Sequence, residues 1–311
     1  MRGMIVAAGL GTRMLPLTQL RPKPTMPVRG IPLIACQLEL LAAHGVTEVI
    51  INAHHLPDLL IEAAERCCPP GMRLEFSLEE TLLDTGGAIR RAAHFLRESD
   101  PCLIIGGDML LDADLTALCR THRERQDAVT FLLRRDPRSR SFGTVGTAAD
   151  GRVRRIGSRL DLGGECDAGI YVWANVISAR ALETLPEREI FGHLDHWLGP
   201  LLESGAEDIR ADVTDVTHGA WEPVGTLAEY LSVNLDPPAL SYIDLDARAR
   251  AEGVELRDDL VVGAGATLAA GASLRRAVIW EGEQVPAGTE ASNGVFAGGV
   301  FHACLEPEAG P

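Results

Sequence analysis

Short apolar runs alternate with amphipathic segments over the first half of the chain. The apolar runs have the length and composition of buried strands and lie at residues 4–8, 46–52, 72–78, 102–107 and 128–133. Apolar residues at helical spacing between these runs predict helices near residues 32–43, 56–66 and 114–124, and a further helix after Gly87. Strands that alternate with helices of this length form a mostly parallel sheet that helices cover on both faces. We therefore expect a three-layer α/β fold with a mostly parallel, Rossmann-like sheet.

The pattern changes twice towards the C-terminus. Residues 142–157 form two short runs around an Asp-Gly turn, which predicts a hairpin beside the main sheet. The strand-and-helix pattern then returns and ends near residue 235. Residues 236–253 contain two consecutive prolines and many charges, as a linker does. We therefore assign residues 1–235 to one main domain and residues 236–253 to a linker.

Residues 262–291 divide into consecutive hexapeptides in which Val262, Leu268 and Leu274 occupy the same position. This period is typical of β-helices, in which each coil stacks on its neighbour because no coil can bury its apolar face alone. We expect a short C-terminal left-handed β-helix of hexapeptide repeats over residues 254–303, with a tail at residues 304–311. A disordered Gly/Ala-rich segment is the alternative. The repeats also offer a contact for a homo-oligomer.

Charge and composition limit the class of partner. The formal net charge of −15 argues against nucleic acid, yet residues 1–38 contain five basic residues and no Asp or Glu, which favours a small anionic substrate. No apolar run has membrane-spanning length and the N-terminus lacks the order of a signal peptide, so we expect a cytoplasmic protein with no membrane partner. Seven cysteines without a C-x-x-C pair predict buried thiols.

The stretch GLGTRMLPLTQLRPKP, which follows the first predicted strand, concentrates basic groups beside glycines. A glycine turn at the carboxyl end of a parallel strand lets backbone N–H groups approach a phosphate. Arg13 offers a planar fork to phosphate oxygens and Lys23 a compact point charge. Lys23 is the only lysine among the 29 lysine and arginine residues of the chain, which marks a position where the two side chains are not interchangeable.

The longer stretch AAGLGTRMLPLTQLRPKPTMPV resembles the signature of the sugar-1-phosphate nucleotidyltransferases, and the likeness extends over residues 1–235. The family segment that contacts the base and ribose resembles ETLLDTGGAIRRA. The family segment that binds Mg²⁺ resembles IIGGDMLLDADL. AGIYVW and WEPVGTLAEYL are similar to segments of the sugar half of the site. The resemblance implies catalytic roles for Arg13 and Lys23, nucleotide binding by Ala8, Gly9, Gly11, Thr12, Arg13, Thr85, Gly86 and Gly87, sugar-phosphate binding by Asp167, Gly169 and Arg159, and metal binding by Asp108.

The resemblance implies transfer of a nucleotidyl group from an NTP to a sugar 1-phosphate, giving an NDP-sugar and pyrophosphate. The attacking phosphate oxygen is already ionised, since its second pKa is about 6, and no general base is needed. Mg²⁺ and basic side chains supply charge neutralisation instead. GTP with a mannose-type sugar and UTP with an N-acetylated or muramic-type sugar both fit the sequence.

The sequence departs from the family at one metal ligand. The family's W-x-D-x-G-T motif supplies a second magnesium aspartate, but Pro223 stands at that position here. The neighbouring Glu222 is a poor substitute, because adjacent strand residues point to opposite faces. Either Mg²⁺ binds Asp108 with water and substrate phosphates alone, or the chain is a catalytically impaired regulatory subunit that binds a nucleotide sugar.

Overall fold

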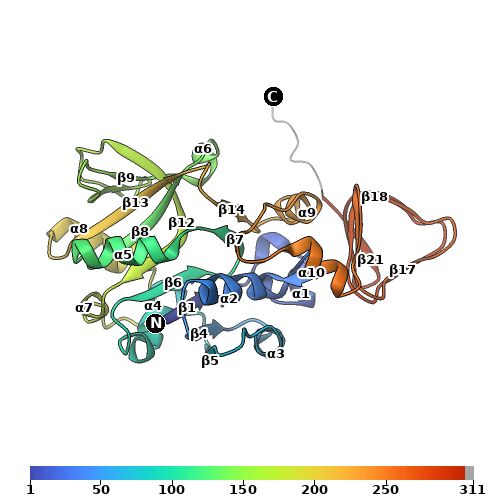
Figure 1. Cartoon of the computed structure of the whole chain (residues 1–311), viewed down its shortest axis with the longest axis horizontal. Coiled ribbons are helices and arrows are strands. Elements are labelled where there is room, and N and C mark those ends of the chain that lie inside the picture. The colour runs from blue at the N-terminus through green and yellow to red at the C-terminus, as the bar shows by residue number, and fades with distance from the viewer. Residues whose placement is uncertain (305–311) are drawn as a thin grey trace.

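The computed structural model describes residues 1–304 of the chain. Its centre is a largely parallel sheet with the strand order β11-β10-β9-β12-β6-β1-β4-β5, and off this path β8 pairs with β12 and β13 pairs with β8 (Figure 1). Strands β1, β4, β5 and β6 are parallel to one another, whereas β12 runs antiparallel to β6 and to β8. The strands of this sheet are β1 (Arg2–Val6), β4 (Glu48–Ala53), β5 (Arg73–Leu78), β6 (Cys102–Gly106), β8 (Val129–Arg135), β9 (Val145–Thr147), β10 (Val153–Ile156), β11 (Leu160–Asp161), β12 (Asp167–Ile177) and β13 (Ile209–Asp215).

Helices cover both faces of the sheet, so the predicted layered α/β fold is confirmed. One apolar cluster joins the sheet to α2 (Leu33–Ala43), α3 (Pro57–Arg66) and α5 (Leu115–Arg125). A second cluster joins the other face to α4 (Asp84–Leu96), α7 (Ala179–Leu182) and the π-helical turn Leu194–Leu198. The remaining short elements are α1 (Leu17–Leu20), α6 (Ser139–Phe142), α8 (Gly199–Ser204), and two small ladders, β2 (Pro27–Val28) with β3 (Ile31–Pro32) and β7 (Met109–Asp112) with β14 (Ala220–Pro223).

The region predicted as a linker is partly helical. Helix α9 (Leu227–Leu235) ends the main domain, and α10 (Leu245–Ala251) lies within residues 236–253. The side chain of Asp244 caps α10 by accepting a hydrogen bond from the backbone N–H of Ala247 at 2.9 Å. In the described part of the chain, 1–304, no helix is long and apolar enough to cross a membrane.

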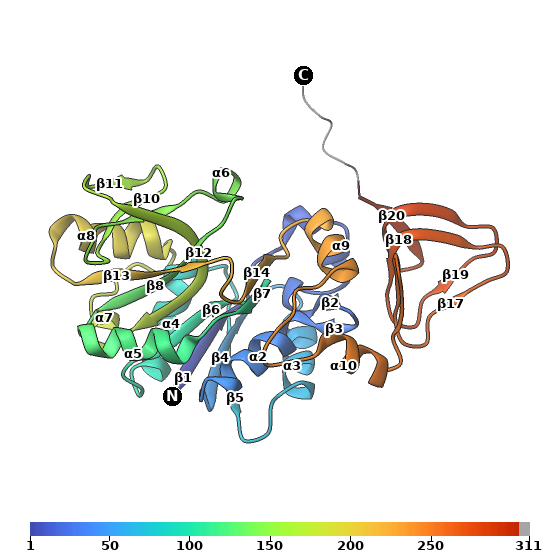
Figure 2. The ribbon, with the colours of Figure 1, turned by 45° about the horizontal axis from the view of Figure 1, so that its top comes forward.

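The C-terminal strands pack against α9 and α10 at one end of the molecule (Figure 2). Leu260 pairs with Ala277 and Ala277 with Gly294, so the chain returns to the same position every 17 residues. Three hexapeptides would give 18 residues, one more than the observed period. These strands are β15 (Glu255–Arg257), β16 (Leu260–Val262), β17 (Thr267–Leu268), β18 (Ser273–Ile279), β19 (Gln284–Val285), β20 (Glu290–Ala297) and β21 (Val300–Ala303). Of the predicted tail, residues 305–311 lie outside the described residues.

Candidate functional site

The glycine loop begins where β1 stops pairing. The backbone N–H of Ala7 donates to Asn52 Oδ1 at 2.7 Å instead of joining the ladder, and β1 therefore ends at Val6 rather than at residue 8. Gly11 has φ +62°, and a Cβ there would lie 2.7 Å from Cγ2 of Thr18. The Thr18 hydroxyl donates to the Gly11 carbonyl at 3.1 Å. Only glycine suits this turn, for reasons of backbone conformation and of space.

Lys23 and Asp108, both predicted site residues, are in direct contact. Lys23 begins a 3-10 turn, Lys23–Thr25, and its extended predecessor Pro22 and its successor Pro24 restrict the backbone on both sides. Its side chain is buried, with a residue exposure of 7%, and Nζ lies 2.6 Å from Oδ2 of Asp108. The structure thus places a compact positive charge against the carboxylate at the end of β6.

Two cavities adjoin at this contact. One has a volume of 520 Å³ and is lined by the glycine loop and by the segment before α4. The other has a volume of 640 Å³ and is lined by the β9–β10 hairpin, by β12 and by residues 192–195. Five residues line both cavities: Arg13, Asp84, Thr85, Asp108 and Trp173. A ligand in one cavity would therefore meet a ligand in the other beside Asp108.

The predicted nucleotide-binding residues do not all line the smaller cavity. Ala8, Gly9, Arg13 and Thr85 do. Gly86 and Gly87 instead lie under residues 189–191, where their backbone N–H groups donate to the Phe191 carbonyl at 2.8 and 3.2 Å. A Cβ on Gly86 would lie 2.3 Å from the Phe191 ring. These two glycines allow α4 to pack against this segment, which forms a wall of the cavity. Gly11 and Thr12 belong to the same loop as Gly9 but do not line the cavity.

The predicted sugar-phosphate residues are also separated. Arg159 lines the larger cavity, where its guanidinium lies 2.9 Å from the Asp195 carboxylate. Asp167 lies outside both cavities and pairs with Arg135 at 2.5 Å, and that hydrogen bond holds the pKa of the Asp167 carboxyl below its usual value. Gly169 precedes Ile170, which lines the larger cavity, and does not line it itself.

Pro223 lines the larger cavity, and Glu222 does not. Pro223 pairs in the β14–β7 ladder with Met109, which is the residue after Asp108. The Glu222 carboxylate accepts a hydrogen bond from Arg138 at 2.7 Å, and Arg138 also binds the Asp136 carboxylate. Glu222 is therefore engaged elsewhere. Among residues 1–304, no group of three or more His, Cys, Asp or Glu side chains is arranged to hold a metal ion.

Trp173, which the sequence analysis did not single out, forms part of the wall that the cavities share. It lies at a register shift in β12 and has φ +56°, so its indole leaves the regular alternation of the strand. A Cβ on Gly106 would lie 3.1 Å from the Cβ of Trp173. The missing side chain of Gly106 thus makes room for this indole.

His193 is a second residue that sequence reasoning missed. Its Nδ1 lies 2.7 Å from the Thr85 hydroxyl, which also accepts a hydrogen bond from the His193 backbone N–H. Burial lowers the pKa of His193 to about 4, so the imidazole is neutral. We assign its proton to Nε2, because the Thr85 hydroxyl then donates to Nδ1. Within residues 1–304, Nε2 is buried without a hydrogen-bond partner. The ring lies 5.0 Å from the Trp173 ring, centroid to centroid.

Asn52 and Glu79 connect the two loops of the smaller cavity. Besides accepting from Ala7, Asn52 donates from Nδ2 to Glu79 Oε1 at 2.7 Å. Glu79 Oε2 accepts from the backbone N–H of Leu83 at 3.0 Å, just before α4. Both side chains are buried, with residue exposures of 2% and 4%. This chain of hydrogen bonds fixes the glycine loop relative to the segment that carries Thr85.

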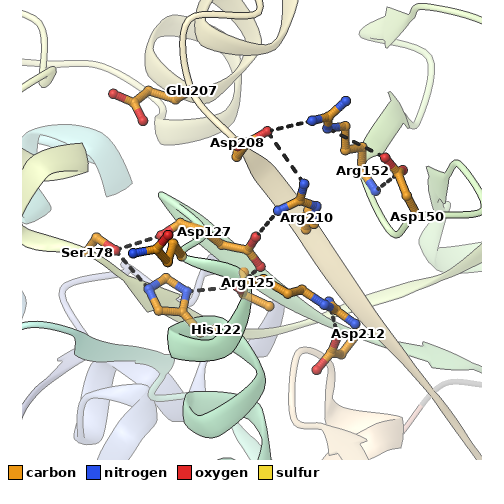
Figure 3. Close-up of polar contacts among 12 residues, drawn as sticks. His122, Arg125, Asp127, Asp150, Arg152, Ser178, Glu207, Asp208, Arg210 and Asp212 are labelled. Atoms are coloured by element: carbon orange, nitrogen blue, oxygen red, sulfur yellow. Dashed lines mark hydrogen bonds and ion pairs between the residues drawn. The ribbon is translucent and has the colours of Figure 1, made fainter.

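A separate polar cluster lies away from both cavities (Figure 3). His122 contacts the Thr130 hydroxyl at 2.8 Å and the Ser178 hydroxyl at 2.9 Å. Ser178 donates to the Asp127 carbonyl at 2.7 Å, and the Asp127 carboxylate binds Arg210. Burial lowers the pKa of His122 to about 4. Because the members already bind one another across α5, β8, β12 and β13, the cluster holds the sheet together there.

Comparisons with known proteins identify the family of the chain. Residues 2–238 match the family described as nucleotidyl transferase. The mannose-1-phosphate guanylyltransferase of Mycobacterium tuberculosis is 31% identical over 302 residues, which cover 92% of this chain and 81% of that relative. The UTP–glucose-1-phosphate uridylyltransferase of Synechocystis is 23% identical over 90% of this chain and 83% of its own length.

A solved structure shows the same fold. HddC from Yersinia pseudotuberculosis, complexed with GMP-PN, superimposes with a TM-score of 0.62 at 22% identity and covers 75% of this chain and 97% of its own. The family match spans more than half of the chain, and the relatives are sugar-1-phosphate nucleotidyltransferases by name. The chain therefore belongs to the nucleotidyl transferase family, and within it to the sugar-1-phosphate nucleotidyltransferases.

Proposed function

We propose that this nucleotidyltransferase, which joins an NTP to a sugar 1-phosphate and releases pyrophosphate, uses GTP and mannose 1-phosphate. The observation that carries the proposal is the pair of cavities that adjoin at Asp108. The smaller cavity would hold the nucleotide against the glycine loop, and the larger one the sugar. The guanylyltransferase from Mycobacterium tuberculosis supports the choice of base and sugar.

The reaction needs positioned charge rather than a base. The sugar phosphate brings an ionised oxygen to the α-phosphorus of the NTP, so that two anions must approach each other. Arg13 lines both cavities and can bind phosphate oxygens from either substrate. We assign to Lys23 the neutralisation of charge at the reacting phosphate, since its Nζ reaches the wall between the cavities.

The donor set at this wall fits Mg²⁺, which prefers oxygen ligands and retains several waters. Asp108 is the residue that would hold the ion, and its side chain remains 48% exposed although Lys23 contacts one of its oxygens. When bound, Mg²⁺ would supply charge neutralisation across the substrate phosphates. Pro223 offers no oxygen side chain, so Asp108 would act with water and phosphate oxygens.

The polar side chains of the larger cavity suit a sugar. Ser158, Thr144 and Glu229 line this cavity and offer hydroxyl and carboxylate groups that can exchange hydrogen bonds with sugar hydroxyls. Asp195 and Arg159, which pair with each other, add polar groups at the same cavity. These groups favour a hydroxyl-rich ligand over an apolar one.

For the C-terminal strands, we propose the left-handed β-helix that the hexapeptide pattern predicts. The return every 17 residues in parallel pairing supports coils of nearly three hexapeptides. The proposed domains are the nucleotidyltransferase domain at residues 1–235, the linker at 236–253 and the β-helix at 254–303. A homo-oligomer through these strands is part of the same proposal, and sedimentation of the purified protein would test it.

The activity test is a substrate panel. The protein would be incubated with Mg²⁺, each of the four NTPs and a set of hexose 1-phosphates that includes mannose 1-phosphate and an N-acetylated sugar, while pyrophosphate release is measured. We expect the highest rate with GTP and mannose 1-phosphate. A highest rate with UTP and an N-acetylated sugar would overturn the substrate assignment. Absence of pyrophosphate in every combination would favour a regulatory subunit that binds nucleotide sugars.

A further inference from the structure

The segment that carries Lys23 is held from outside by the C-terminal strands. Figures 1 and 2 show α9 between the main sheet and these strands, and one apolar cluster contains residues of all three parts. Its members include Met26 and Val28 from the Lys23 segment, Leu231 from α9, and Val278 and Val295 from the C-terminal strands. The signature loop and the strands that end the chain therefore share one core.

A chain of hydrogen bonds passes through this core. Tyr230 of α9 is fully buried, and its hydroxyl donates to the Pro27 carbonyl at 2.6 Å. The same hydroxyl accepts from the indole N–H of Trp280 at 2.9 Å. Trp280 follows β18 and is itself 3% exposed. The position of the Pro27 carbonyl, four residues after Lys23, thus depends on an indole of the C-terminal strands.

Arg21 makes a second connection on the other side of Lys23. Its guanidinium lies 4.2 Å from the centre of the Trp280 ring, within the range of a cation–π interaction. It also pairs with the Glu281 carboxylate at 2.8 Å. Trp280 is therefore connected to the chain on both sides of Lys23. It contacts Arg21 directly, and it is linked to Pro27 by hydrogen bonds through the Tyr230 hydroxyl.

Close packing adds contacts at each end of the segment. A Cβ on Gly298 would lie 3.1 Å from Leu20 Cδ1, and a Cβ on Gly30 would lie 2.5 Å from Val254 Cγ2. Leu20 ends α1, and Val254 directly precedes β15. The C-terminal region thus packs against both ends of residues 20–30, before and after Lys23.

We propose that the C-terminal strands position Lys23 for the reaction, with Tyr230 and Trp280 as the positioning residues. The inference rests on the proposed role of Lys23 in the nucleotidyl transfer. A catalytic charge must be held close to its productive position, and a displacement of about 1 Å can cost on the order of a hundredfold in rate. The two hydrogen bonds of Tyr230 supply such a constraint, and neither Tyr230 nor Trp280 itself lines a cavity.

Tyr230→Phe tests the proposal, because it removes one hydroxyl and leaves the ring. Tyr242→Phe is the matched control, since the hydroxyl of the half-buried Tyr242 likewise donates to a backbone carbonyl, that of Leu111, at 2.9 Å. Trp280→Phe is the second variant and removes the indole N–H. We expect Tyr230→Phe and Trp280→Phe to lower kcat about tenfold, with KM for the sugar 1-phosphate changed less than twofold. Tyr242→Phe should retain the wild-type kcat.

Hydrogen exchange supplies a readout that does not need turnover. The amides of Thr25 and Met26 bond to the carbonyls of Pro22 and Lys23 at 2.9 and 3.0 Å, and we expect them to exchange faster in Tyr230→Phe than in Tyr242→Phe. Equal exchange in both variants, or a wild-type kcat in Tyr230→Phe, would overturn the inference. If the wild-type protein released no pyrophosphate, the proposed function would fail, while the exchange comparison would still decide whether these contacts hold the segment.

Discussion

Replacing Lys23 by arginine keeps the charge and changes its shape. The lysine is 7% exposed, it lies between two prolines, and its Nζ is 2.6 Å from Asp108. The guanidinium is larger and planar and sits on a differently shaped side chain, so none of its nitrogens takes the position of Nζ without a shift of the surrounding groups. Forcing a larger group into a well-packed site costs about 1 to 3 kcal/mol, and here the strain can be relieved by moving the cation away from the reacting phosphate.

The magnitude follows from this packing. We expect Lys23→Arg to lower kcat at least about tenfold, which corresponds to about 1.4 kcal/mol in the barrier. Lys23→Met, which removes the charge, should lower kcat by about 100- to 1000-fold, as loss of one positioned electrostatic group does. Both variants should fold, because the Asp108 side chain is 48% exposed and water can solvate its carboxylate.

The assay is steady-state pyrophosphate release at saturating substrates, with thermal denaturation of each variant as the test of folding. Arg73→Lys is the matched control, since it exchanges the same two residue types at a side chain that is 68% exposed on β5. We expect the control to match the wild type. A Lys23→Arg variant that folds and turns over within twofold of the wild type would refute the reasoning.

Three further predictions concern the metal site, the loop contacts and pH. Pro223→Asp should lower the Mg²⁺ concentration needed for half-maximal rate, because it adds an oxygen ligand beside Asp108; an unchanged metal titration would contradict this. Asn52→Ala removes the side chain that links the Ala7 amide to the Glu79 carboxylate. In initial-rate measurements it should raise KM for the NTP severalfold and leave KM for the sugar 1-phosphate unchanged. Burial lowers the pKa of His122 and His193 from 6.5 to about 4, so the unfolded chain takes up protons first as pH falls. The free energy of unfolding, measured by urea titration, should therefore decrease between about pH 6.5 and pH 4, by up to roughly 3 kcal/mol for each histidine, and a flat profile would contradict this.

The layered α/β arrangement was predictable because each element carries its own pattern. Apolar runs identify β1, β4, β6 and β8 within a few residues, and helical spacing identifies α2, α3 and α5. Of the seven cysteines predicted as buried thiols, Cys36, Cys102 and Cys119 are buried, whereas Cys67, Cys68 and Cys304 are only partly buried and Cys166 is exposed. The exact end of β1 was not predictable, because it depends on Asn52, a side chain 45 residues away from Ala7 that withdraws the Ala7 amide from the ladder.

Part of the candidate site was predictable from one continuous stretch of chain, since the predicted Ala8, Gly9 and Arg13 all line the smaller cavity. Lys23 and Asp108 were both predicted as site residues. Their direct contact was not predictable, because the local sequence around each residue carries no information about the distance between them. Trp173 and His193 were missed because their roles come from tertiary placement. A positive φ at a register shift turns the indole of Trp173, and Thr85, 108 residues away, binds His193. Gly106 is a signal that could have pointed to Trp173, since a residue without a side chain leaves space for a neighbouring one.

In the proposed metal site, Pro223 stands where the resemblance implies a second aspartate, and this gives the contact between Lys23 and Asp108 greater weight. With Pro223 in place, Asp108 is the carboxylate of the shared wall that contacts Lys23, and the two charges balance in the absence of substrate. In the proposed reaction, two phosphate-bearing substrates bring several negative charges to this wall. Without an aspartate at position 223, the protein has one fewer fixed ligand to hold a cation that neutralises these charges. Neutralisation then depends more on Arg13 and Lys23, and a point charge neutralises a phosphate only where it is held at contact distance. The contacts of Tyr230 and Trp280 with the Lys23 segment therefore matter most in a chain with proline at position 223. Removing these contacts should lower kcat more in this protein than in a Pro223→Asp variant.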